Sequence, residues 1–286
     1  MARPKNLKTL IKTCLRVLEA GDGTVAVPGA FNAVSAMLIE KAGFKAVYIS
    51  GAGLSNSNGL ADAGLLTRAD VKRQSAYIIK SVNIPAIVDV DTGFGGPAEV
   101  KKTVKAFEAI GASAIQIEDQ VTQKRCGHLP GKRVIPAHEF ADKIRAAVSA
   151  RKDREFLIIA RTDARAVTGM DDAIFRAKLY AKAGADVIFP EALETREEFL
   201  FFSKSLKGVP LMANMTEFGK TPYLTVNDFK KMGYGIVIFP MTAFRVAMKS
   251  MEDALGVIKT NGTQRLLLPK MQTRAELYEL LKYRIE

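Results

Sequence analysis

Two aspartates and a glutamate lie where apolar runs of the sequence end, and their spacing is the first sign of chemistry. Asp89 and Asp91 are two residues apart, so in a strand their side chains point to the same face. Two carboxylates held together repel each other unless a cation or a proton lies between them. Such oxygen ligands suit Mg²⁺, with Mn²⁺ as the alternative cation, and Glu118 is expected to complete the ligand set directly or through water. A pair of solvated aspartates at a strand end is the alternative interpretation.

A cysteine in a basic segment is the second sign of chemistry. Cys126 lies between Lys124 and Arg125 on one side and His128 on the other. Basic neighbours lower the pKa of a thiol, so we expect Cys126 to be fit for proton transfer or nucleophilic attack. An incidental surface thiol is the alternative. The second histidine, His138, is expected to be structural or solvated.

Further polar residues end other apolar runs. These residues are Ser50, Arg161, Glu191 and Asn214. Because all strand carboxyl ends of a parallel barrel lie on one side, residues far apart in sequence would meet there in one pocket. Polar residues also mark strand ends without any function. Arginine binds carboxylates through two hydrogen bonds, which makes Arg161, Arg245 and Arg274 candidates for holding an anionic substrate.

The elements that would position these residues are short strands alternating with helices. Eight apolar runs bounded by turn residues predict strands at 24–27, 46–50, 86–91, 114–118, 156–161, 186–190, 210–214 and 235–240. A helix-ending glycine precedes several of them, for example Gly43, Gly111, Gly184 and Gly233. Eight such units favour a closed (β/α)8 barrel over a doubly wound open sheet. The segment 93–98 matches a dinucleotide-binding pattern, but the nearby aspartates would repel a pyrophosphate, so we interpret it as an ordinary glycine-rich loop.

We expect one barrel domain over residues 1–286. It would carry an N-terminal helix at 1–20 and two C-terminal helices within 241–286. Two long connections, from Gly51 to Thr67 and from Asp119 to Pro136, follow strand ends and are expected to be mobile lids.

Composition excludes several classes of protein. No apolar run is long enough for a membrane span, and the N-terminal leucines are spaced as a helix face rather than as a signal sequence, so we expect a cytoplasmic protein. Two distant cysteines and two histidines cannot build a disulfide framework or a four-ligand zinc site. The net charge of +12 raises a nucleic-acid hypothesis, but the basic residues are scattered and no aromatic ladder accompanies them. A lysine-rich solvated surface is favoured over a nucleic-acid partner, and a positive field that raises the encounter rate with a small anionic substrate is an intermediate interpretation.

Several of these segments together resemble the isocitrate lyase and phosphoenolpyruvate mutase superfamily, and within it the 2-methylisocitrate lyases. The resemblance covers nearly the whole chain, and the Cys-Gly-His loop with the Asp-x-Asp strand is highly specific to the lyases. The matching segments are 48–53, 88–95, 117–120, 124–128, 160–164, 189–192, 213–219 and 271–274.

The resemblance implies a Mg²⁺-dependent carbon–carbon lyase of the methylcitrate cycle, which cleaves the tricarboxylate 2-methylisocitrate to pyruvate and succinate in propionate catabolism. Tyr48 is similar to the family's base, and Cys126 to the general acid that protonates the succinate carbanion, with Lys124 and His128 in the same catalytic group. The family also suggests a homotetramer with exchanged C-terminal helices. The implied substrate-binding residues are Ser50, Gly51, Ala52, Asp62, Gly127, Arg161, Glu191, Asn214, Thr216, Arg245 and Arg274.

Other activities of the superfamily stay open. Isocitrate lyases carry a tryptophan where this chain has Phe189, and the chain contains no tryptophan; a smaller aromatic leaves space for the extra methyl group. Leu129-Pro130-Gly131 and Ala52 depart from the pattern of many methylisocitrate lyases. Isocitrate cleavage, dimethylmalate cleavage, oxaloacetate hydrolysis and phosphonate mutase chemistry therefore remain alternatives.

Overall fold

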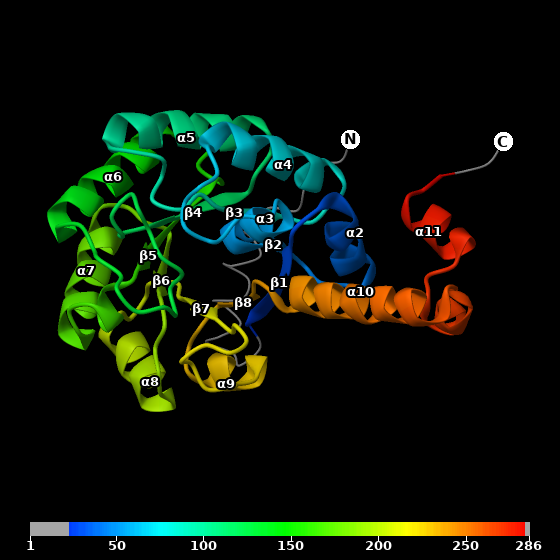
Figure 1. The fold of residues 1–286 in the computed structure, drawn as a ribbon. Helices are drawn as coiled ribbons and strands as arrows, with labels where there is room; N and C mark the ends of the chain where they lie inside the picture. Colours follow the sequence, from blue (N-terminus) through cyan, green and yellow to red (C-terminus); the bar gives the residue numbers. More distant parts are fainter. Residues whose placement is uncertain (1–22, 284–286) are drawn as a thin grey trace.

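The computed structural model describes residues 23–283, which form a parallel β-barrel surrounded by helices (Figure 1). The order of the eight strands is β6-β5-β4-β3-β2-β1-β8-β7. A parallel bridge between Ile188 and Leu211 joins the two ends of this order, so the sheet closes. The predicted (β/α)8 barrel is confirmed. The strands are β1 (Val25–Ala30), β2 (Val47–Ile49), β3 (Ala86–Asp89), β4 (Ala114–Glu118), β5 (Leu157–Thr162), β6 (Val187–Pro190), β7 (Met212–Asn214) and β8 (Ile236–Phe239).

The strands are apolar because both of their faces are covered. Every residue of β4 and β5 is buried. The buried side chains form two clusters. The smaller cluster includes Val27, Ile87 and Phe189, and the larger, outer cluster contains the residues packed against the helices. Alternate residues of a barrel strand point inward, so a polar residue at an inward position near the carboxyl end faces the site rather than solvent.

Helices follow the strands around the barrel. The predicted glycines at 43, 111, 184 and 233 all have the left-handed backbone that ends a helix and turns the chain toward the next strand. The helices before the last strand are α2 (Ala33–Lys41), α3 (Gly51–Ser57), α4 (Arg68–Lys80), α5 (Pro97–Ala109), α6 (Ala137–Ala150), α7 (Met170–Lys182), α8 (Arg196–Ser205) and α9 (Val226–Lys231), with a short 3-10 helix η1 (Ala164–Ala166).

The prediction of a long loop from Gly51 to Thr67 is wrong in its first half. Helix α3 begins directly after β2, with Ser50 as its N-cap: the Ser50 hydroxyl accepts a hydrogen bond from the Gly53 N–H at 3.2 Å. The small and polar residues of 51–57 are typical of a loop, and the N-cap at Ser50 is the sequence feature that indicated the start of a helix. The segment 119–136 is irregular as expected, but a bridge between Gln120 and Val134 holds its two ends together.

The chain after β8 forms the predicted pair of helices. These are α10 (Thr242–Asn261) and α11 (Arg274–Leu280), separated by the 3-10 helix η2 (Arg265–Lys270). Helix α10 extends away from the barrel, and α11 lies near its far end (Figure 1). The predicted helix at 1–20 lies outside the described residues. Among the helices of residues 23–283, none combines the length and the apolar character that crossing a bilayer requires.

Candidate active site

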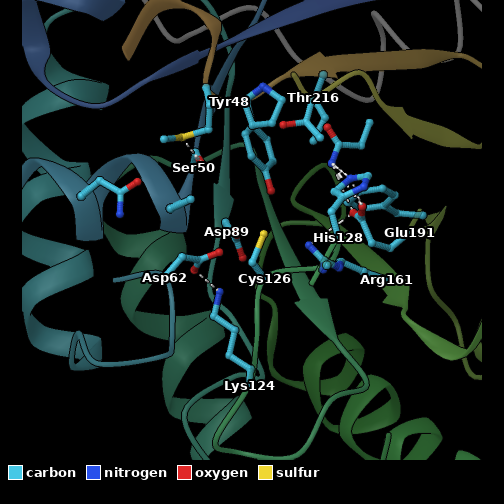
Figure 2. Close-up of a pocket in the computed structure, with 18 of the residues that line it drawn as sticks. Tyr48, Ser50, Asp62, Asp89, Lys124, Cys126, His128, Arg161, Glu191 and Thr216 are labelled. Carbon is cyan, nitrogen blue, oxygen red and sulfur yellow. Dashed lines mark hydrogen bonds and ion pairs between the residues drawn. The ribbon is translucent and has the colours of Figure 1, made fainter. Parts of the chain in front are cut away.

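A cavity of about 130 Å³ opens among the carboxyl ends of the strands. Figure 2 shows that side chains from both halves of the barrel point toward it. The predicted residues that line it are Tyr48, Ser50, Ala52, Asp62, Asp89, Lys124, Cys126, Gly127, His128, Arg161, Glu191, Asn214, Thr216 and Arg245. Gly51, Asp91 and Glu118 lie behind this wall, each in contact with one of its residues.

The two predicted aspartates do lie together, but they do not share one face of a strand as predicted. Strand β3 ends at Asp89, and Asp91 lies in a turn with a left-handed backbone, φ 48°. The Asp91 N–H donates to Asp89 Oδ1 at 3.1 Å, and the Gly51 N–H donates to Asp89 Oδ2 at 3.3 Å. Burial and the neighbouring Asp91 raise the pKa of Asp89 to about 6. The pair is therefore under the electrostatic repulsion that a bound cation would relieve.

A lysine from the cysteine loop balances this charge. Lys124 Nζ lies 2.6 Å from Asp91 Oδ1 and 2.5 Å from Asp62 Oδ1, and its side chain is only 4% exposed. Burial opposes its charge, but the carboxylates of Asp91, Glu118 and Asp62 outweigh burial and raise the pKa of Lys124 well above its ordinary value. Lys124 is thus an ammonium ion that binds carboxylates, and it cannot serve as a base at neutral pH.

The inner face of the site contains a tyrosine that keeps its proton. The Tyr48 hydroxyl donates to Gln116 Oε1 at 2.5 Å, and Gln116 Nε2 donates to Asp89 Oδ1 at 3.3 Å. Burial, followed by the charge of Asp89, raises the pKa of Tyr48 well above 10.0. Tyr48 is therefore a hydrogen-bond donor in this structure. Gln116 was missed at the sequence level, although a polar residue two positions before Glu118 within an apolar run was its signal.

The guanidinium of Arg161 is fixed by carboxylates on several sides. Its Nε and Nη2 donate to the two carboxylate oxygens of Asp163 at 2.9 and 3.0 Å. Glu118 Oε2 and Glu191 Oε2 each lie 3.4 Å from it. Burial opposes the charge of Arg161, but Asp163, Glu118 and Glu191 outweigh it, so its pKa is raised further. Asp163 was also missed, because nothing in the sequence distinguished it from an ordinary loop aspartate.

The donors present fit a hard divalent cation held by two carboxylates and water. Both oxygens of the buried Glu118 lack a hydrogen-bond partner among residues 23–283, and burial raises the pKa of this carboxyl well above 4.5. A Cβ built at Gly51 would lie 3.1 Å from Asp89 Oδ2 and 3.3 Å from Asp91 Oδ1, so the glycine keeps space beside both carboxylates. In the described part of the chain, no three Asp, Glu, His or Cys side chains form a ready-made metal cage.

The predicted lowering of the Cys126 pKa is wrong. Cys126 is a free thiol, and burial raises its pKa above 9.0. The basic neighbours are used elsewhere: Lys124 binds carboxylates, and Arg125 Nη1 donates to the Pro130 carbonyl at 3.2 Å. A thiol with a raised pKa is a proton donor rather than a nucleophile at neutral pH.

His128 anchors the cysteine loop to the opposite wall. Its Nδ1 accepts a hydrogen bond from the Lys220 N–H at 3.1 Å, and its Nε2 lies 2.9 Å from Glu191 Oε1. Because Nδ1 accepts, the proton of the neutral ring lies on Nε2, which donates to Glu191. The amide of Asn214 also donates to Glu191. Burial opposes the charge of Glu191, but Arg161 and then His128 lower its pKa to about 2.

The remaining wall mixes polar and apolar groups. Arg245 projects from α10 into the pocket, where its Nε lies 3.5 Å from Glu217 Oε2. Ser50 and Met241 are in contact, with Oγ and Sδ 3.8 Å apart. The lining residues that sequence reasoning did not select as site residues are Asn56, Ile238, Pro240 and Met241, which carry no distinctive chemical signal, and Phe189, which it noted only for its size.

The prediction of Arg274 as a substrate ligand is not met within one chain. Arg274 is the exposed first residue of α11 and does not line the cavity. Helix α11 packs beside α2, and Lys41 Nζ lies 3.6 Å from Glu279 Oε1. Arg274 does not reach the cavity of its own chain because α10, which precedes it, leads the backbone away from the barrel.

Comparison with known proteins gives consistent results. A family model described as phosphoenolpyruvate phosphomutase matches residues 15–259. A 2-methylisocitrate lyase from Aeropyrum pernix is 50% identical over 269 residues, which cover 94% of this chain and 86% of the relative. A solved 2,3-dimethylmalate lyase superposes with a TM-score of 0.88 at 37% identity, covering 95% of this chain and 91% of that chain. A phosphonopyruvate hydrolase in complex with oxalate and Mg²⁺ superposes with a TM-score of 0.84 at 34% identity, covering 95% of each chain.

These relatives confirm the resemblance that the sequence motifs indicated, and with it the prediction of an enzyme. The match extends over the barrel and over the segments that form the pocket. The chain belongs to the phosphoenolpyruvate phosphomutase family, in which its similar relatives include 2-methylisocitrate lyase.

Proposed function

We propose that this enzyme cleaves 2-methylisocitrate to pyruvate and succinate, as a carbon–carbon lyase of the methylcitrate cycle in propionate catabolism. The observation that carries the proposal is the thiol of Cys126, with its raised pKa, in one pocket with Asp89 and the buried cation Arg161, while Asp91 lies beside Asp89 behind the pocket wall. The 50% identity to a 2-methylisocitrate lyase supports the choice of substrate.

In this proposal Asp89 and Asp91 hold Mg²⁺, with Mn²⁺ as the alternative, and Glu118 acts through water. The bound cation supplies a Lewis acid that makes the substrate's 2-hydroxyl more acidic. Arg161 and Arg245 bind substrate carboxylates, for which planar guanidinium groups are well suited. Ser50, Asn214 and Thr216 supply neutral hydrogen-bonding groups around them.

The reaction moves two protons and two electron pairs within the pocket. Tyr48 is the proposed acceptor of the hydroxyl proton; because burial and the charge of Asp89 raise the pKa of its phenol, positive charge held at Asp89 would be needed to favour the phenolate that accepts this proton. The O–H electron pair then forms the carbonyl of pyruvate, and the bond between carbons 2 and 3 breaks. The released pair passes to the succinate carbon, which takes the proton of Cys126, and solvent reprotonates the thiolate.

The test is a coupled assay of the purified protein with Mg²⁺ and 2-methylisocitrate, in which lactate dehydrogenase follows pyruvate. Isocitrate, 2,3-dimethylmalate, oxaloacetate and a phosphonate are assayed beside it at equal concentration, with the products quantified by liquid chromatography because not every reaction in this panel releases pyruvate. We expect turnover to be highest with 2-methylisocitrate and to fall about 10²- to 10⁴-fold in Cys126→Ser. Absence of pyruvate from a folded protein, or higher turnover with another member of the panel, refutes the proposed substrate.

We also propose a homotetramer in which neighbouring subunits exchange C-terminal helices. Helix α10 has no buried residue, and it exposes Val246, Leu255 and Ile258. Apolar surface of this kind is typical of an interface between subunits. In such an assembly Arg274 would belong to a neighbour's pocket. Light scattering that gives the mass of one chain at micromolar concentration refutes this assembly.

A further inference from the structure

The loop that carries Cys126 is held by more than its catalytic neighbours. Its ends are joined at the bridge between Gln120 and Val134, where the Val121 N–H also donates to the Arg133 carbonyl at 3.0 Å. Beyond this neck the chain runs over the pocket. A loop closed only at its neck could tilt, so the position of the thiol depends on contacts made nearer to its tip.

Lys132 makes two such contacts. Its Nζ donates to the Gly127 carbonyl at 2.5 Å and to Asp163 Oδ1 at 2.8 Å. The side chain is 2% exposed, so these hydrogen bonds are shielded from water. One of them reaches the residue that follows Cys126, and the other reaches the end of β5.

The acceptor on the barrel side is rigid. The Asp163 N–H donates to Asp119 Oδ1 at 2.9 Å, and both Asp163 carboxylate oxygens accept from Arg161. The acceptor on the loop side has little room to move: a Cβ at Gly127 would lie 2.5 Å from Arg161 Nη2 and 2.6 Å from Glu191 Cγ. Lys132 therefore joins a fixed point of the barrel to the backbone beside the thiol.

We propose that Lys132 is a positioning residue for the reaction: by tying the Gly127 carbonyl to Asp163, it fixes the Cys126 thiol over the pocket. The inference rests on the proposed function for its effect on turnover, but its effect on the thiol's position can be measured without substrate. Lys132 touches no reacting atom and acts only through the loop backbone.

The experiment compares Lys132→Met with Arg133→Met, a change of the adjacent, exposed cation. The rate of Cys126 alkylation by iodoacetamide is followed by peptide mass spectrometry, which separates it from Cys14. We expect Lys132→Met to raise this rate at least about fivefold, because the thiol leaves its half-buried position more often, whereas Arg133→Met leaves the rate unchanged. With an active substrate, kcat falls about 10- to 100-fold in Lys132→Met with little change in KM, since misplacement by about an ångström has effects of this size.

Thermal unfolding and limited proteolysis separate positioning from general loss of structure. Alkylation that stays within about twofold of the wild-type rate overturns the proposal, and so does alkylation that rises only in proportion to proteolysis of the whole chain. If Lys132→Met does not fold, Lys132→Leu, which also lacks a donor for the Gly127 carbonyl, is read by the same two criteria. A wild-type protein without lyase activity contradicts the proposed function, but the alkylation result still decides the role of Lys132.

Discussion

Replacement of Gly127 by alanine tests whether the position of the cysteine loop controls turnover. The added Cβ would lie 2.5 Å from Arg161 Nη2, 2.6 Å from Glu191 Cγ and 2.8 Å from Glu191 Cδ. Non-bonded heavy atoms prefer about 3.5–4 Å, so these contacts are about 1 Å too short. Arg161 and Glu191 are buried and paired with each other, which leaves the loop as the part that must retreat.

A retreat of about 1 Å is expected to cost about 10²-fold in kcat, because proton transfer requires the thiol within hydrogen-bond reach of the carbon it protonates. Stability should fall by only about 1–3 kcal/mol, the usual cost of overpacking. Gly96→Ala is the matched control, since that glycine is exposed and a Cβ there meets nothing within 4 Å. Steady-state kinetics and urea unfolding of both variants give the result. If the kcat of Gly127→Ala falls by no more than about twofold from the wild-type value, the reasoning is refuted.

Four further outcomes follow from the charges of the site. Because burial raises the pKa of Cys126, iodoacetamide should alkylate it with a midpoint above that of free cysteine, and a midpoint below pH 8.5 contradicts its role as an acid. Glu191→Gln should lower the free energy of unfolding by about 3–5 kcal/mol because it breaks buried ion pairs, whereas the exposed Glu252→Gln should leave the urea midpoint unchanged. The lowered pKa of Glu191 stabilises the fold above the unfolded carboxyl pKa, and this contribution should be lost as pH falls toward about 2, as followed by acid unfolding. Removal of divalent ions with EDTA should abolish turnover and added Mg²⁺ should restore it; a Tm that Mg²⁺ does not raise contradicts the proposed cation site.

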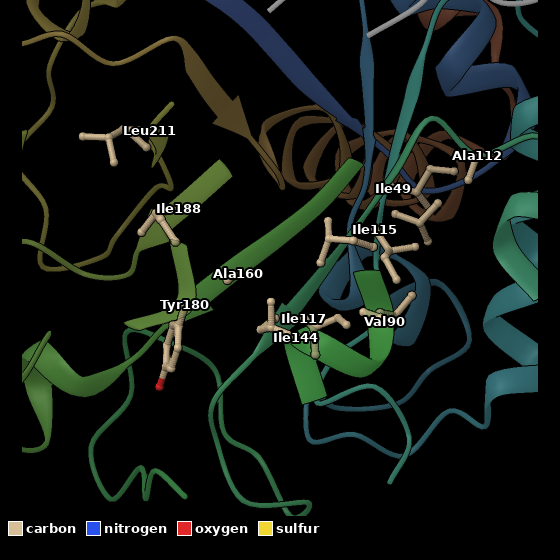
Figure 3. Close-up of a cluster of buried hydrophobic side chains, with 14 of the residues drawn as sticks. Ile49, Val90, Ala112, Ile115, Ile117, Ile144, Ala160, Tyr180, Ile188 and Leu211 are labelled. Atoms are coloured by element: carbon tan, nitrogen blue, oxygen red, sulfur yellow. The ribbon is translucent and has the colours of Figure 1, made fainter. Parts of the chain in front are cut away.

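The barrel was predictable because its strands are buried on both faces. Side chains of β4 such as Ile115 and Ile117 lie in the outer hydrophobic cluster with Ile144 of α6 (Figure 3). A short run of β-branched residues followed by a helix with a terminal glycine is therefore repeated along the chain. The path of α10 was not predictable in this way, since its amphipathic pattern indicates a helix but not the surface that covers it.

Within the site, the sequence showed which residues stand at strand ends but not how their charges are paired. Asp89, Glu118 and Arg161 follow from the rule that carboxyl ends of barrel strands converge. Asp163, which fixes Arg161, lies in a turn after β5 and looked like any solvated aspartate. Contacts between loops depend on the path of the backbone, and the spacing of residues within one segment of a sequence does not reveal that path.

The cysteine loop shows the consequence of this limit most clearly. Its cations Lys124 and Arg125 and its imidazole at His128 suggested an activated thiolate when read as neighbours in sequence. In the structure Lys124 binds Asp62 and Asp91, His128 donates to Glu191, and Lys132 binds Asp163. Each of these groups faces a carboxylate of another segment. Their electrostatic attraction to these carboxylates holds the loop in place and does not stabilise a thiolate. Burial instead raises the pKa of the Cys126 thiol, so the thiol keeps a proton that it can transfer to a carbanion.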